Sequence, residues 1–236
     1  MVTQTRRVVP YILATMMLAL SATAHATFVS SKDFDFKKLL VQPPALDSDD
    51  VKKEIEQMLK LQAQRTDEQI TRIKSESKMT PFIFSQSLGS WFNPDDLPVT
   101  AGFLDKVLTD AKSVCSSSKE VFNRTRPFVI DDRLKPVSDK EKSSSYPSSH
   151  STRAMVLALT LAEMLPDQKM TVIAQGRLIG DDRVVAGQHF PSDVAAGRIL
   201  AKAIFEKMLQ NPDFQAELAK AKQECLAKEP KEPVKK

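Results

Sequence analysis

The sequence has few of the features that would assign it directly to a function class. After residue 26 no stretch is apolar enough to span a membrane, because even the run at 154–165 is interrupted by Glu163. The formal net charge is only +4 over 236 residues, which gives no indication of a surface for nucleic acid or another polyanion. Strand-like alternation is scarce and no internal repeat is present.

The first 26 residues have the pattern of a signal peptide. Arg6 and Arg7 precede a short apolar run at 8–20, and small residues at 24–26 suit a cleavage site. A membrane anchor is the alternative, but the run is shorter than the roughly 20 residues needed to span a bilayer. We therefore expect a periplasmic or secreted protein that begins near Thr27 and has no stable membrane anchor. Loss of the two arginines lowers its formal charge from +4 to +2.

Cys115 and Cys225 are the two cysteines of the chain. In an exported protein such a pair can be oxidised, which would tie the last helical segment to the body of the domain. Two free thiols are the alternative. The sequence does not decide between them.

Helical spacing of apolar residues dominates the chain after its first 50 residues. It predicts a helix or helix pair within 51–77, and further helices near 101–112, 152–165, 170–180, 193–210 and 213–226. We expect one all-α domain, a helical bundle, over residues 27–227. The tail at 228–236 alternates lysine, glutamate and proline, which predicts disorder.

A polar stretch between Phe128 and Tyr146 predicts a surface loop between helices. Loops of this length in a compact domain are often functional.

Two histidines remain once His25 leaves with the signal peptide, and each stands at a predicted helix entry. His150 directly precedes the helix expected at 152–165, where free backbone amides favour an anion. Asp193 follows His189 by four residues, and a carboxylate at that distance can fix the tautomer of the imidazole. This pattern predicts a site in which the two histidines act together.

Three cations near these histidines suit an oxyanion. Lys119 precedes Arg126 by seven residues, and Arg183 precedes His189 by six. Arginine forks and lysine point charges bind the oxygens of a phosphoryl group well.

Taken together, these residues form three spaced motifs: Lys119 with Arg126-Pro127, then Pro147-Ser148-Ser149-His150, then Arg183 with His189 and Asp193. They resemble the signature of the type 2 phosphatidic acid phosphatase superfamily. More narrowly, the chain resembles the bacterial class A non-specific acid phosphatases. The likeness extends over nearly all of the mature chain, including the Pro43-Pro44 entry and the turn at 211–214.

This resemblance implies a fold, a reaction and a set of roles. The fold would be that of the phosphatidic acid phosphatases and haloperoxidases. His189 would attack phosphorus to form a phosphohistidine, oriented by Asp193, and His150 would protonate the leaving group. The phosphoryl oxygens would be held by Lys119, Arg126, Ser148, Arg183 and the backbone amides of Ser149 and His150.

The resemblance also implies partners. The expected substrates are small phosphomonoesters, with inorganic phosphate as a product and no nucleic acid partner. The family needs no metal or other cofactor, and its members suggest a homodimer. An acid optimum would follow, because His150 must be protonated while His189 is neutral.

Two positions depart from the family pattern. Ser149 stands where glycine is usual, and its side chain would be strained if the site needs a positive φ. Asp182 stands where serine is usual, and it would either pair with Arg183 and weaken phosphate binding, or point to solvent.

Two other functions are alternatives to the phosphatase. A vanadate-dependent haloperoxidase would use the same oxyanion cradle. A phosphate-binding helical protein that has lost catalysis through Ser149 and Asp182 would bind phosphate without turnover.

Overall fold

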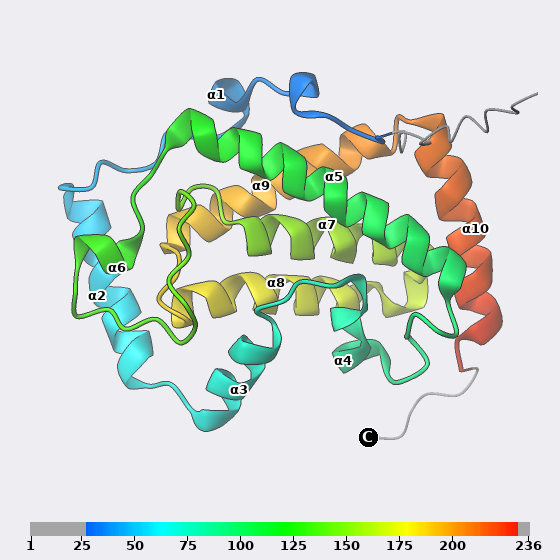
Figure 1. Ribbon diagram of the computed structural model, residues 1–236, viewed down its shortest axis with the longest axis horizontal. Coiled ribbons are helices and arrows are strands. Elements are labelled where there is room, and N and C mark those ends of the chain that lie inside the picture. The colour runs from blue at the N-terminus through cyan, green and yellow to red at the C-terminus, as the bar shows by residue number, and fades with distance from the viewer. Residues whose placement is uncertain (1–26, 231–236) are drawn as a thin grey trace, which may run out of the picture.

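The computed structural model describes residues 27–230, so the predicted signal peptide and residues 231–236 lie outside the described part (Figure 1). Within 27–230 every regular element is helical, which confirms the all-α prediction. In chain order the elements are η1 (Ser31–Asp33), α1 (Phe36–Leu39), α2 (Asp49–Ala63), α3 (Asp67–Ser75), η2 (Pro81–Phe84), α4 (Ser85–Leu88), α5 (Pro98–Phe122), α6 (Pro127–Ile130), α7 (Ser149–Met164), η3 (Pro166–Gln168), α8 (Lys169–Val185), α9 (Pro191–Met208) and α10 (Pro212–Lys228).

Each of the predicted helices is present, most of them with somewhat different ends. The segment 51–77 forms a pair, α2 and α3, because Thr66 caps a new helix: its hydroxyl accepts a hydrogen bond of 3.2 Å from the amide of Gln69. The helix expected at 101–112 continues to Phe122 and ends at Asn123, which has a left-handed φ of 42°. This extension places Lys119 in the last turn of α5.

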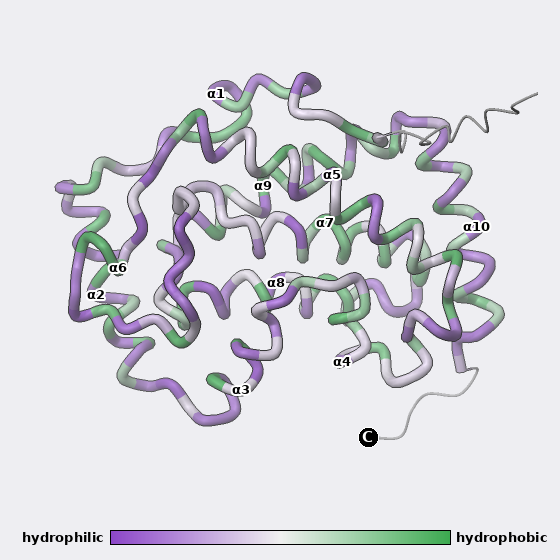
Figure 2. Tube along the Cα trace, in the orientation of Figure 1, coloured by the Kyte–Doolittle hydropathy of each residue, from purple (hydrophilic) through white to green (hydrophobic). Residues whose placement is uncertain are grey.

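Helix α7 lies at the centre of the bundle (Figure 1), with α5, α8 and α9 packed against it and α10 crossing one end. Its side chains are buried over most of its length. Figure 2 shows hydrophobic stretches in α5 and α7 and a mostly hydrophilic α3. One large apolar cluster forms the core, and it includes Phe103, Leu157, Leu161, Leu200 and Phe214.

A glycine sets the close approach of α9 to the start of α7. A Cβ atom at Gly197 would lie 2.8 Å from the carbonyl oxygen of Ser148, a distance that real side chains do not show. The lack of a side chain therefore allows the beginning of α9 to lie directly beside the Ser148–His150 segment.

Four helix ends meet at one end of the bundle, on the left in Figure 1: the last turns of α5 and α8 and the first turns of α7 and α9. The predicted site residues lie on these ends or in the connections next to them. The loop at 131–148, which follows α6 and leads into α7, passes over the same region. It contains most of the predicted polar loop, whose first residues form α6.

The disulfide considered from the sequence is not formed. Cys115 and Cys225 are both free and buried. The thiol of Cys225 lies 3.4 Å from the hydroxyl of Thr100, whereas Cys115 contacts the carbonyl of Pro147 at 4.0 Å. Each thiol is packed in a different part of the core, which is why the pair does not meet.

None of the helices in residues 27–230 combines the length and the apolar character that crossing a bilayer would require.

Candidate active site

His189 lies in the tight turn between α8 and α9. Gly187 has a φ of +74°, which few other residues tolerate, and Pro191 begins α9 two residues after the histidine. The side chain of His189 is fully buried, and its Nδ1 atom lies 3.4 Å from Oδ2 of Asp193. The predicted contact between these two residues is therefore present, at the long end of hydrogen-bond distance.

Asp193 accepts hydrogen bonds from several groups that hold its carboxylate in place. Oδ2 accepts from the hydroxyl of Ser145 at 2.5 Å and from the amide of Phe190 at 2.9 Å. Oδ1 accepts from Arg124 at 2.6 Å. These donors hold the buried carboxylate in its orientation toward His189.

The other ring nitrogen of His189 faces a cation. Nε2 lies 2.9 Å from Nη1 of Arg126, the first predicted phosphate ligand. If Nδ1 carries the proton toward Asp193, then the lone pair on Nε2 accepts from Arg126, and it is the lone pair that a nucleophilic imidazole would use. Burial and the charges of Arg126 and Lys119 hold the pKa of His189 well below its usual value, so the ring is neutral in mild acid.

Lys119 and Arg183 complete the group of predicted cations. The ammonium of Lys119 is buried and donates to the carbonyl of Ser144, and burial lowers its pKa to about 8. Arg183 is 2% exposed, and its Nη2 atom donates to Glu141 at 2.8 Å. Its Nε and Nη1 atoms have no partner among the described residues.

His150 lies on the first turn of α7, opposite Arg183. Neither of its ring nitrogens has a hydrogen-bond partner in the described part of the chain. Burial, reinforced by the charge of Arg183, lowers its pKa to about 3. An anion bound beside this ring would raise that pKa, because a negative charge stabilises the imidazolium.

Ser148 and Ser149 start the same helix. Ser148 is its N-cap, and its hydroxyl accepts from the amide of Ser151 at 3.4 Å. The amides of Ser149 and His150 occupy the first two helical positions, which have no partner within a helix. The hydroxyl and amides of the predicted cradle therefore lie together at the start of α7, next to His150 in the chain.

Both departures from the family pattern have a structural explanation. Ser149 is helical and does not have a positive φ, so its side chain causes no backbone strain of the kind that a positive φ would impose. Asp182 does not pair with Arg183 and does not face solvent, so both readings of that position were wrong. Instead it accepts two hydrogen bonds from Arg72 of α3, at 2.6 and 2.9 Å.

Three charged residues at the site were missed from the sequence: Arg124, which binds Asp193; Arg72, which binds Asp182; and Glu141, which binds two of the cations. Of these three residues, the sequence gives an indication only for Arg124, because it stands two residues before the Arg126-Pro127 motif. Glu141 lies within the polar loop that was predicted to be functional, but nothing distinguished it from its charged neighbours.

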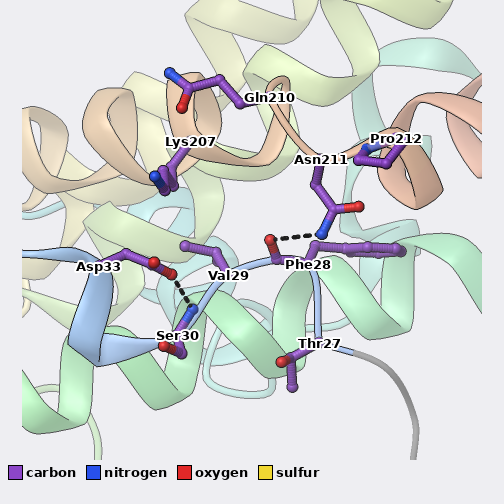
Figure 3. Close-up of a pocket in the computed structure, with 9 residues that line it drawn as sticks. All are labelled: Thr27, Phe28, Val29, Ser30, Asp33, Lys207, Gln210, Asn211 and Pro212. Carbon is purple, nitrogen blue, oxygen red and sulfur yellow. Dashed lines mark hydrogen bonds between the residues drawn. The ribbon is translucent and has the colours of Figure 1, made fainter.

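A pocket of about 470 Å³ lies elsewhere, between the first described residues and the turn from α9 to α10 (Figure 3). Its lining includes Phe28, whose carbonyl accepts a hydrogen bond of 3.1 Å from Asn211. None of the predicted site residues lines it. Among residues 27–230, no three histidine, cysteine, aspartate or glutamate side chains are grouped so as to hold a metal ion.

A family model matches the part of the chain that contains these motifs. The model of the PAP2 superfamily matches residues 103–211, the span that holds all three motifs. This part of the chain is therefore similar to the PAP2 superfamily. The resemblance predicted from the motifs is therefore confirmed at the level of the superfamily.

Individual similar proteins give a more specific comparison than the superfamily does. The chain is 36% identical over 147 residues to a non-specific acid phosphatase of Salmonella typhimurium, and 34% identical over 146 residues to one of Providencia stuartii. An acid phosphatase of Zymomonas mobilis is 34% identical over 132 residues. The first two alignments cover 60% of this chain and 59% of the relative's length. They confirm the predicted resemblance to the bacterial non-specific acid phosphatases.

Among solved structures, the fold is similar to that of a bacterial vanadium-dependent iodoperoxidase. The TM-score is 0.56 at 18% identity, over 75% of this chain and 53% of that one. A likeness at this level of identity concerns the fold alone, and it agrees with the predicted helical architecture.

Proposed function

We propose that this protein is an acid phosphatase that hydrolyses small phosphomonoesters through a phosphohistidine at His189. The observation that carries the proposal is the buried row of Asp193, His189 and Arg126, in which one ring nitrogen faces a carboxylate at 3.4 Å and the other faces a guanidinium at 2.9 Å. A carboxylate on one side orients the ring, and a guanidinium on the other can hold a phosphoryl oxygen.

In the first step, Arg126, Arg183 and Lys119 bind the nonbridging oxygens of the phosphoryl group. The lone pair on Nε2 of His189 forms a bond to phosphorus, while the bond from phosphorus to the ester oxygen breaks. His150 gives a proton to that oxygen, so the leaving group departs as an alcohol. The cations stabilise the charge on the transferring group, and Asp193 stabilises the developing imidazolium charge of His189.

In the second step, water attacks the phosphohistidine. His150, now neutral, takes a proton from the water, the bond between nitrogen and phosphorus breaks, and inorganic phosphate leaves. Both histidines return to their starting states, so the cycle balances without a cofactor.

The test is phosphate release from p-nitrophenyl phosphate in mild acid by the purified chain from residue 27. We expect turnover by the wild type and none by His189→Ala. Trapping with radioactive substrate followed by alkaline denaturation is expected to leave label on the wild-type protein, since phosphohistidine survives base. Binding of phosphate without turnover would support the catalytically impaired alternative instead.

The proposal includes export and self-association. Residues 1–26 lie outside the described part, and the case for a signal peptide rests on their sequence pattern. Terminal sequencing of protein from the periplasmic or secreted fraction is expected to begin at Thr27. Light scattering is expected to give the mass of a homodimer, and a monomer mass at working concentration would contradict that part.

A further inference from the structure

Glu141 reaches from the loop at 131–148 into the space between the predicted phosphate ligands. Its Oε2 atom lies 2.7 Å from Nη2 of Arg126, and its Oε1 atom lies 2.8 Å from Nη2 of Arg183. Oε1 also lies 3.8 Å from Nδ1 of His150. The two carboxylate oxygens therefore take the contacts that two phosphoryl oxygens would make in the proposed reaction.

The carboxylate remains charged across the acid range. Burial on its own would raise the pKa of Glu141, but the charges of Arg126 and Arg183 lower it to about 2. Glu141 is thus a permanent anion at the point where a substrate anion must bind.

Glu141 satisfies the cradle only in part. Arg183 keeps two buried donors without a partner among the described residues, and both ring nitrogens of His150 are likewise unpaired. A tetrahedral group with three oxygens presents more acceptors than a planar carboxylate. The two free donors of Arg183 and the single N–H of the neutral His150 ring favour a phosphoryl group over the glutamate, which distinguishes the contact from a permanent structural ion pair.

Glu141 also lies on the solvent side of the site. Its side chain is 27% exposed, whereas those of Arg126 and Arg183 are 4% and 2% exposed. Its neighbours Asp139 and Lys140 are exposed. A carboxylate that covers buried cations from an exposed loop can leave without disturbing the helical core.

The part of the loop around Glu141, residues 138–143, is attached to the site through Gln188 and Arg126, and these contacts would define its closed position. The side-chain amide of Gln188 donates to the carbonyls of Asp139 at 2.8 Å and Ser138 at 3.3 Å. Arg126 donates to the carbonyl of Ser143 at 2.8 Å. Arg126 therefore binds both the loop backbone and its carboxylate, so a phosphoryl group that engages Arg126 would weaken the hold on the loop.

We infer that Glu141 is a tethered competitor that occupies the phosphoryl-binding position and must leave it before a phosphomonoester or phosphate binds. This inference concerns the regulation of the site and rests on the proposed function. Competition by a tethered anion reduces the apparent affinity for substrate by the fraction of molecules in which the loop is open.

The experiment measures binding of inorganic phosphate to the full mature chain by calorimetry. We expect Glu141→Gln to bind phosphate about tenfold more tightly than the wild type, and to have a KM for p-nitrophenyl phosphate that is lower by a similar factor. Asp139→Asn is the matched control, because it removes one negative charge from the same loop without touching the cradle. Its affinity and KM are expected to match the wild type.

Affinity in Glu141→Gln equal to or weaker than that of the wild type would overturn the inference. So would a tightening of equal size in Asp139→Asn, because the effect would then be one of net charge. A fall in kcat with a shifted pH profile would also overturn it, since Glu141 would then be a positioning residue for His150.

Failure of the proposed function gives a different result. If the wild type binds phosphate but turns over nothing, tighter binding by Glu141→Gln still supports the competitor. A second variant, Glu141→Asp, keeps the charge on a shorter side chain and is expected to bind phosphate with intermediate affinity. If Glu141→Gln fails to fold, Glu141→Asp still tests the inference.

Discussion

The Nη1 atom of Arg124 lies 2.6 Å from Oδ1 of Asp193, and both side chains are almost completely buried. The same guanidinium also donates to the hydroxyl of Ser192 at 2.7 Å and lies 4.0 Å from the centre of the Phe190 ring. Because Arg124 occupies Oδ1, the other oxygen of Asp193 is left to face His189. Arg124 therefore positions the residue that orients the proposed nucleophile.

We predict that Arg124→Gln lowers kcat by at least about tenfold with little change in KM, since Asp193 would lose the partner that fixes and neutralises it. Arg124→Lys is expected to recover part of the loss, because it restores the charge without the planar fork. Steady-state kinetics on p-nitrophenyl phosphate provide the measurement. Arg133→Gln is the control, as this arginine lies at the surface and pairs with Asp131 and Glu56. A raised KM with unchanged kcat would instead assign Arg124 to substrate binding.

The low pKa of His150 predicts where the catalytic proton comes from. With a pKa of about 3 in the unliganded site, this ring is neutral at pH 5, although the proposed first step needs it protonated. A phosphomonoester loses its second proton near pH 6, so below that pH the monoanion carries the proton into the site. We expect kcat/KM to fall as pH rises above about 6.

The measurement compares an alkyl phosphate with a fluorinated analogue whose second phosphate pKa is lower. The alkaline limb of kcat/KM is expected to move to lower pH with the analogue. If both substrates gave the same alkaline limb, the limb would report the titration of a group on the enzyme. A rate that is flat from about pH 5 to about pH 9 would contradict the proposed acid–base roles.

The helical conformation of Ser149 predicts the outcome of restoring the usual glycine. Since Ser149 has no positive φ, Ser149→Gly relieves no strain and only adds flexibility to the unfolded chain. We expect the free energy of unfolding to fall by up to about 1 kcal/mol, with kcat unchanged within a factor of about two. Urea denaturation and steady-state kinetics check the two parts. A large gain in kcat would mean that the serine side chain obstructs the phosphoryl group.

The buried carboxyl group of Glu76 leads us to predict that the free energy of unfolding depends on pH. This carboxyl is completely buried, and burial together with the charge of Asp182 raises its pKa to about 7. The folded state therefore holds a proton that the unfolded state releases above a pKa of about 4.3. The stabilisation is fully present below that value and is lost as pH rises toward 7.

We expect Glu76→Gln, which cannot ionise, to gain stability relative to the wild type as pH increases from about 4.5 to about 7.5. The variant is expected to unfold at a higher temperature than the wild type, and this difference in midpoint should be at least about 3 °C larger at about pH 7.5 than at about pH 4.5. Glu120→Gln, at an exposed position on α5, is the control. A difference between variant and wild type that is constant over this range would contradict the buried proton.

Much of the site was predictable because its motifs are local. His189 and Asp193 are four residues apart, and the helix that starts at Pro191 brings them together without help from distant parts of the chain. Helical spacing similarly indicated the elements, although their ends depended on caps such as Thr66 and Ser148. The three predicted cations could be named because they stand at characteristic distances from these motifs.

The sequence by itself thus determined an all-helical chain with two histidines, an aspartate and three cations in a phosphatase-like order. Only the tertiary structure decided which charge meets which. Arg72 binds Asp182 across 110 positions, and Arg183 binds Glu141 across 42. Such pairs depend on how helices and loops pack, because one charged residue among 34 lysines and arginines has no local signal that names its partner.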